Sequence, residues 1–198
     1  MRTLSNIGTL LVINILTVIC SIPIFTAGAA LSAMHYMIMK MMDGEDGRIP
    51  KRYFEQFRAN FKTSTPVWLV LLILAIFLWY DYRVLHAGSD TPFRLLLVAV
   101  FVGAFLLFAI FVWIFPVMAR FEGGFGGAFR NAGRLSIGSF PRTLLMMALW
   151  FVITFALSQS WKLLPLYFLF GFSAPTYFSA LVYYPVIKRM IRKATGEP

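Results

Sequence analysis

Long apolar runs, separated by short polar segments, begin at the start of the chain. The first runs from Leu4 to Met42 and is interrupted by Ser21-Ile22-Pro23. One straight helix of this length would measure about 58 Å at 1.5 Å per residue. The hydrocarbon core of a bilayer is only about 30 Å thick. The pattern therefore predicts a helical hairpin that turns near Pro23.

Further apolar runs follow, and Gly171 and Pro175 interrupt the last of them, which predicts a kink there. These runs cover Pro66–Leu85, Phe93–Met118, Pro141–Leu157 and Leu163–Ile187, with a tight turn expected at 158–162. Apolar residues make up 60% of the chain and charged residues 13%, which is typical of a membrane protein. We therefore predict one integral membrane domain over residues 1–198. The fold class is an all-α membrane protein, a bundle of five to six transmembrane segments with a Pro23-broken N-terminal hairpin.

Two polar segments, 43–65 and 120–141, are predicted to form short amphipathic cytoplasmic helices. In the first, Pro50 can open a helix that carries aromatic side chains on one face. In the second, a helix can begin near Gly127. Such a helix can lie on the membrane, pack on the protein or contact a partner. The candidate partner-interaction residues are Phe54, Phe57, Asn60, Phe61, Phe129, Arg130 and Asn131.

The net charge of +10 comes from basic residues that flank the apolar runs. This distribution fits the positive-inside rule and argues against nucleic-acid binding. Both polar segments and the C-terminus should be cytoplasmic. A hairpin at the start then places the N-terminus inside, with six segments. A single kinked helix would place it outside, with five.

Polar side chains within the first apolar run allow two interpretations. The favoured one is that they hydrogen-bond to neighbouring helices. The alternative is that they line a small polar cavity. The candidates for that cavity are Asn14, Ser21, Thr26, Ser32 and His35.

Recognisable catalytic chemistry is lacking in the sequence. Cys20 is the only cysteine, and His35 and His86 stand outside any HExxH context; neither a GxSxG nor a CxxC motif occurs. The glycines of 123–127 lack the Lys-Ser or Lys-Thr and the preceding strand of a nucleotide-binding loop. We therefore expect no catalytic residue, metal or cofactor, and no enzyme.

Several short motifs resemble the YesL-like family of bacterial membrane proteins. They are Asn14, Ser21-Ile22-Pro23, Thr26, Gly28, Ala33, Tyr36, Phe54, Phe57, Asn60 and Phe61, then Asn131-Ala132, Pro141 and Tyr183-Tyr184-Pro185. The family is a domain of unknown function, typically encoded beside carbohydrate ABC transporters. The resemblance implies a role alongside sugar import in the bacterial cytoplasmic membrane, and it supplies no catalytic residues.

Two functions follow as hypotheses. The first is a non-enzymatic accessory or scaffolding component of carbohydrate ABC transport, or of its regulation. Its partners would be the lipid bilayer and a permease or ATPase subunit, and a homo-oligomer is also compatible with the sequence. The alternative is a small independent transporter or channel, with its site at the broken N-terminal helix. The spans hold no central Asp, Glu, Lys or Arg, which argues against an ion-coupled pump.

Overall fold

The structure, a computed structural model, describes residues 2–45, 47–86, 91–121, 123–159 and 164–195. All regular structure in these ranges is helical, which confirms the predicted all-α class. In chain order the elements are α1 (Arg2–Ser21), the 3-10 helix η1 (Ile24–Thr26), α2 (Ala27–Met42), α3 (Ile49–His86), α4 (Thr91–Met118), α5 (Gly124–Gly138), α6 (Phe140–Ser158), α7 (Leu164–Phe170) and α8 (Ser173–Thr195).

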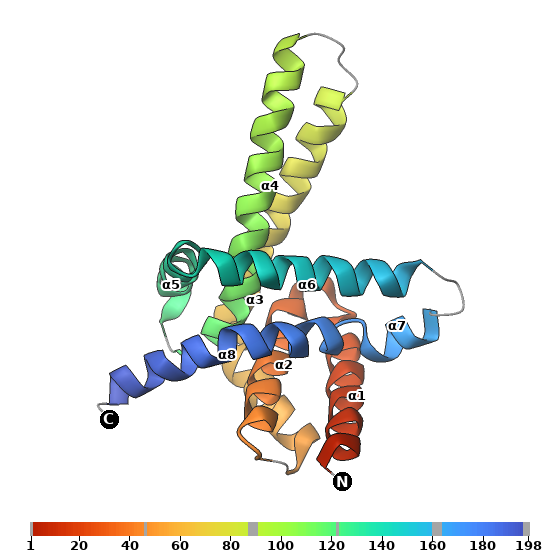
Figure 1. Cartoon of the computed structure of the whole chain (residues 1–198), viewed down its shortest axis with the longest axis vertical. Coiled ribbons are helices and arrows are strands. Elements are labelled where there is room, and N and C mark those ends of the chain that lie inside the picture. Colours follow the sequence, from red (N-terminus) through yellow and green to blue (C-terminus); the bar gives the residue numbers. More distant parts are fainter. Residues whose placement is uncertain (1, 46, 87–90, 122, 160–163, 196–198) are drawn as a thin grey trace.

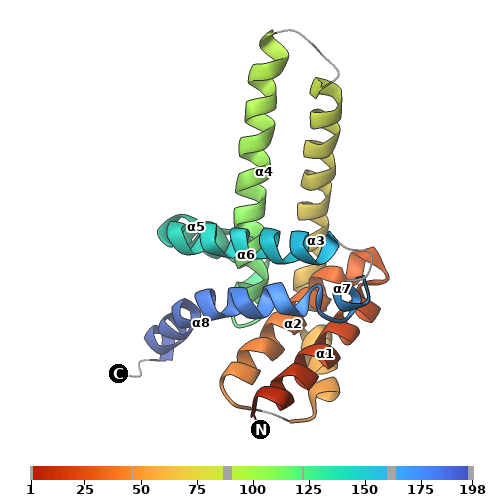
Figure 2. The same ribbon diagram turned by 45° about the vertical axis from the view of Figure 1, so that its right-hand side comes forward.

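The helices form a body from which one helical hairpin projects (Figures 1 and 2). The body contains α1, α2 and the first part of α3, and α6 and α8 run across it. The hairpin consists of the second part of α3 and the first part of α4. The body therefore holds most of the buried residues, while the hairpin exposes apolar side chains such as Phe77 and Phe101.

Within the described residues, two helices are long and apolar enough to cross a membrane. They are α3 and, within α4, the stretch Leu96–Met118. The pair α5 and α6 qualifies only when taken together, and it is bent by 100° at its break. The length and apolar character of these helices support the conclusion that the chain is a membrane protein. The count of five to six segments, the choice of membrane and the cytoplasmic C-terminus remain predictions.

The first apolar run forms a hairpin that turns at Pro23, as the sequence predicts. The Tyr53 hydroxyl lies 3.1 Å from both Thr17 Oγ1 and the Ala30 carbonyl oxygen. These two residues stand on opposite sides of the turn, so α1 and α2 must run back alongside each other (Figure 1). At the turn the Thr26 hydroxyl donates to the Pro23 carbonyl oxygen at 2.7 Å and also bonds the Cys20 carbonyl oxygen.

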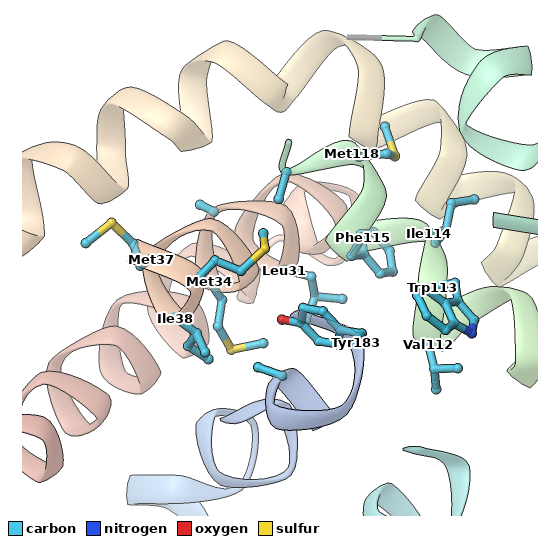
Figure 3. Packing of buried hydrophobic residues seen from close by; sticks show 14 of the residues in the cluster. Leu31, Met34, Met37, Ile38, Val112, Trp113, Ile114, Phe115, Met118 and Tyr183 are labelled. Carbon is cyan, nitrogen blue, oxygen red and sulfur yellow. The ribbon is translucent and has the colours of Figure 1, made fainter. Parts of the chain in front are cut away.

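Helix α2 is the centre of the body and is buried along almost its whole length. Small side chains near its start allow α3 to approach closely. A Cβ atom added at Gly28 would lie 2.5 Å from the Ser64 carbonyl oxygen and from Trp68 Cβ. The rest of the core gathers around α2, whose Met34 and Ile38 belong to one buried cluster with side chains of α4 and Tyr183 of α8 (Figure 3).

The predicted division between a surface helix over 43–65 and a span from Pro66 is wrong. Helix α3 is 38 residues long and continues through Pro66 without a break. Its buried residues Tyr53, Ser64, Val67 and Leu71 keep one face toward the body on both sides of the proline. Packing of this continuous face outweighs the one backbone hydrogen bond that a proline removes. Thus only α5 forms the separate short helix predicted for the two polar segments.

The other two predicted breaks have different outcomes. Helix α7 ends at Phe170 and α8 begins at Ser173, which confirms the kink predicted near Gly171 and Pro175. The turn predicted at 158–162 falls mostly outside the described residues. Between α5 and α6, the Thr143 hydroxyl donates to the Ser136 carbonyl oxygen at 3.0 Å and accepts the Trp113 indole N–H at 2.8 Å. These bonds tie the bend to α4.

The close approach of α2 and α3 predicts that Gly28→Ala destabilises the protein. The new Cβ atom must push two rigid backbones apart, which costs about 1–3 kcal/mol. Thermal unfolding in detergent, followed by loss of the monodisperse chromatographic peak, measures this. Gly133→Ala is the matched control, because nothing lies within 4 Å of its added Cβ atom. Equal midpoints for the two variants would contradict the packing described here.

Candidate functional site

The side chain of Asn14 hydrogen-bonds to the backbone at the break between α7 and α8. Its side chain is fully buried on α1. The amide nitrogen donates to the Phe168 carbonyl oxygen at 2.8 Å. Its carbonyl oxygen accepts the backbone N–H of Phe172 at 3.1 Å and of Ser173 at 2.9 Å. One side chain thus satisfies three backbone groups that the break leaves without helical partners.

The other cavity candidates contact different elements. Thr26 lies in the Pro23 turn, and Ser21 is half-buried at the end of α1. The hydroxyl oxygens of Ser32 and Ser64 are 2.8 Å apart, which joins α2 to α3. His35 Nδ1 lies 2.8 Å from the Tyr183 hydroxyl of α8. The four with such bonds serve helix packing, and a role for any of the five in lining a cavity stays a prediction.

A polar hollow of about 540 Å³ opens between α2, α3, the end of α4 and the start of α5. Its polar side chains are Tyr36, Gln56, Asn60, Thr63 and Arg120. Only Asn60 is among the predicted site residues, because the lining comes from four separate segments and no local motif marks it.

Among the described residues that line this hollow, Arg120 is the charged one, and only 16% of its side chain is exposed. Its guanidinium carbon lies 5.3 Å from the centroid of the Tyr36 ring, a cation–π geometry. One terminal nitrogen, Nη2, donates to Asp43 Oδ2 at 3.1 Å, whereas Nε is buried without a hydrogen-bond partner. The guanidinium is therefore held in place with donor capacity to spare.

The carboxylate of Asp43, directly after α2, binds several side chains. Lys188 Nζ lies 3.7 Å from its Oδ1, and the Tyr184 hydroxyl donates to the same oxygen. Arg120 thus shares this carboxylate with a lysine, and its charge is only partly neutralised. Nearby, Lys40 bonds Glu45 at 2.6 Å, which holds the pKa of that carboxyl below its usual value.

The predicted partner-interaction residues fall on two helices that the structure brings into contact, α3 and α5. Phe54 and Arg130 are exposed, and the remaining five, Phe57, Asn60, Phe61, Phe129 and Asn131, are partly buried. Ile137 is not among the predicted residues, although it is 81% exposed and is the most exposed large apolar side chain described for α5. The helical spacing of the sequence indicates this exposure, because Ile137 lies on the side of the helix opposite the buried Ala128 and Ala132.

An apolar hollow of about 510 Å³ lies within the projecting hairpin, lined by aromatic and aliphatic side chains of α3 and α4, among them Trp68 and Phe111. Its lining is that of a lipid-facing surface rather than a site for chemistry. Among the described residues, no three His, Cys, Asp or Glu side chains gather closely enough to hold a metal ion.

Comparisons with known proteins find similarity to proteins of undetermined role. A family model described as "Protein of unknown function, DUF624" matches residues 10–82. The uncharacterized protein YteU of Bacillus subtilis (strain 168) is 22% identical over 176 residues, covering 88% of this chain and 77% of that protein. No solved structure matches. These matches are consistent with the YesL-like resemblance, and the range matched by the family model contains the Pro23 turn and helix α2.

The three hydrogen bonds of Asn14 predict that Asn14→Ala destabilises the protein. The substitution leaves buried backbone groups unpaired, each at a cost of about 1–3 kcal/mol before local relaxation. We expect a lower midpoint of thermal unfolding in detergent and faster proteolysis near Gly171. Asn131→Ala, the same substitution at a partly buried position of α5, should change neither. Wild-type behaviour of Asn14→Ala would show that the break does not depend on this side chain.

Proposed function

We propose that the protein is a non-enzymatic accessory or scaffolding component of carbohydrate ABC transport, which binds a permease or ATPase subunit through α3 and α5. The observation that carries the proposal is the contact between these two helices. Two polar segments about 70 residues apart in sequence are brought together beside the membrane-type helices. They can thus present one continuous surface.

The exposed side chains of this surface suit a protein partner. Both helices combine exposed aromatic or aliphatic groups with arginines: Phe54, Arg58, Phe125, Arg130, Arg134 and Ile137. Arginine and aromatic residues are enriched in protein interfaces. The positive charge would favour an acidic surface on the partner. The association with sugar import itself rests on the YesL-like resemblance.

The transporter alternative has less support from the arrangement of polar groups. Asn14, Ser32 and His35 each have a hydrogen-bond partner within the protein. A transport pathway through the N-terminal hairpin would have to break these bonds to use the same groups for a solute. We therefore place partner binding first.

The proposal predicts that the double substitution Arg130→Glu with Arg134→Glu lowers recovery of the transporter subunits. Affinity purification of the tagged full-length chain from its native membrane, with quantitative mass spectrometry, measures the permease or ATPase that stays bound. Reversing two interface charges should reduce recovery by about tenfold or more. Phe54→Ser and Ile137→Ser, each made alone, should also lower the recovery of the permease or ATPase. Neither should prevent folding, because both side chains are exposed.

Arg189→Glu is the matched control, because it reverses an exposed charge on α8. It should leave recovery unchanged. If the charge reversal on α5 recovers as much permease and ATPase as wild type, or if neither subunit is recovered with wild type, the proposed surface is wrong.

A further inference from the structure

We infer that the polar hollow around Arg120 binds a small ligand bearing an anionic group, such as a phosphate monoester. The site is separate from the exposed side chains proposed to bind a partner, and it does not depend on that function. Its volume of about 540 Å³ exceeds what a free phosphate ion fills, so it leaves room for the organic part of a ligand.

The guanidinium of Arg120 supplies the charge for an anion. Arg120 shares Asp43 with Lys188 and with the Tyr184 hydroxyl, so the cluster of Asp43, Arg120 and Lys188 keeps a net positive charge. Arginine is the residue best suited to phosphate because its planar donors match the oxygens of the anion. The cation–π contact with Tyr36 and the bond to Asp43 restrict the movement of this guanidinium before any ligand arrives.

Unused polar groups surround this arginine. Within the described part of the chain, the Gln56 amide nitrogen and the Tyr36 hydroxyl have no hydrogen-bond partner, although both residues line the hollow. The Asn60 amide nitrogen donates to the Gln56 carbonyl oxygen at 3.1 Å, which leaves its own side-chain oxygen open. Carboxamides and hydroxyls of this kind recognise the polar substituents of a ligand as well as its anionic group.

The start of α5 adds a favourable backbone environment. Gly123 and Gly124 line the hollow, and Gly124 has a φ of +61°, which a side chain would strain. The N-cap residue of α5 is Gly123, which has no side chain that could cap the first turn. The N–H groups at the start of a helix and the positive end of the helix dipole attract an anion in the same sense as Arg120. Because no Lys-Ser or Lys-Thr follows the glycines, the hollow is not a nucleotide-binding loop.

The anionic group can come from a soluble phosphate ester or from the headgroup of an anionic lipid. Thermal unfolding of the full-length protein distinguishes these sources. One arm titrates glycerol 3-phosphate into protein in a non-ionic detergent, against sodium chloride at equal ionic strength. The other arm compares nanodiscs of phosphatidylglycerol with nanodiscs of phosphatidylcholine. We expect a saturable rise in the midpoint in at least one arm.

The Gln56→Glu substitution tests whether the effect belongs to this hollow. It keeps the side chain's size but places a negative charge in the lining, so the apparent affinity should fall by about tenfold or more. Gln159→Glu, the same substitution at an exposed position at the end of α6, should stay within about twofold of wild type. Arg120→Lys should also weaken binding, because a point charge replaces the planar donors.

Each outcome decides the matter. Saturable stabilisation by glycerol 3-phosphate identifies a soluble ligand, and stabilisation only by phosphatidylglycerol identifies a lipid headgroup. Either supports the site if Gln56→Glu weakens the effect and Gln159→Glu does not. The inference is overturned if neither probe stabilises the wild type beyond sodium chloride or phosphatidylcholine, or if Gln56→Glu responds like wild type.

Discussion

A helix that breaks inside an apolar chain leaves backbone N–H and C=O groups without partners, and lipid offers none in exchange. The arrangement of this protein depends on how two such breaks are satisfied. The Thr26 hydroxyl donates a hydrogen bond to the Pro23 carbonyl oxygen in the turn. Asn14 bonds three backbone groups at the break between α7 and α8. The bonds of Asn14 are also long-range contacts, since they join the break between α7 and α8 to the first helix.

Close packing of α2 then orders the rest of the body. Its small residues bring the backbone of α3 within reach, and Ser32 and His35 add polar contacts to α3 and α8. Where helices pack without a hydrophobic gain over lipid, such small-residue contacts and interhelical hydrogen bonds supply the specificity. Asp43, which follows the last residue of the same helix, binds Arg120, and Tyr36 of this helix lines the polar hollow, so core packing and the candidate ligand site share one element.

The sequence predicted those features that a local signal marks. Pro23 and Gly171 marked the breaks, and hydropathy marked the all-helical membrane class. The passage of α3 through Pro66 was not predictable from local rules, because it depends on packing of Tyr53 and Val67 against the body. The polar hollow was also missed, since residues from four segments meet there only in the folded chain. Exposure of Ile137 was readable from its position opposite Ala128, once the bounds of α5 were known.

Contact between the surface formed by α3 and α5 and a transporter subunit is the central claim, and site-specific photo-crosslinking in native membranes tests it most directly. A photoreactive side chain at Ile137 should crosslink to a carbohydrate permease or its ATPase. One at Phe151, an exposed position on α6, should crosslink to neither. Equal crosslinking at both positions, or no transporter subunit at Ile137, would contradict the account.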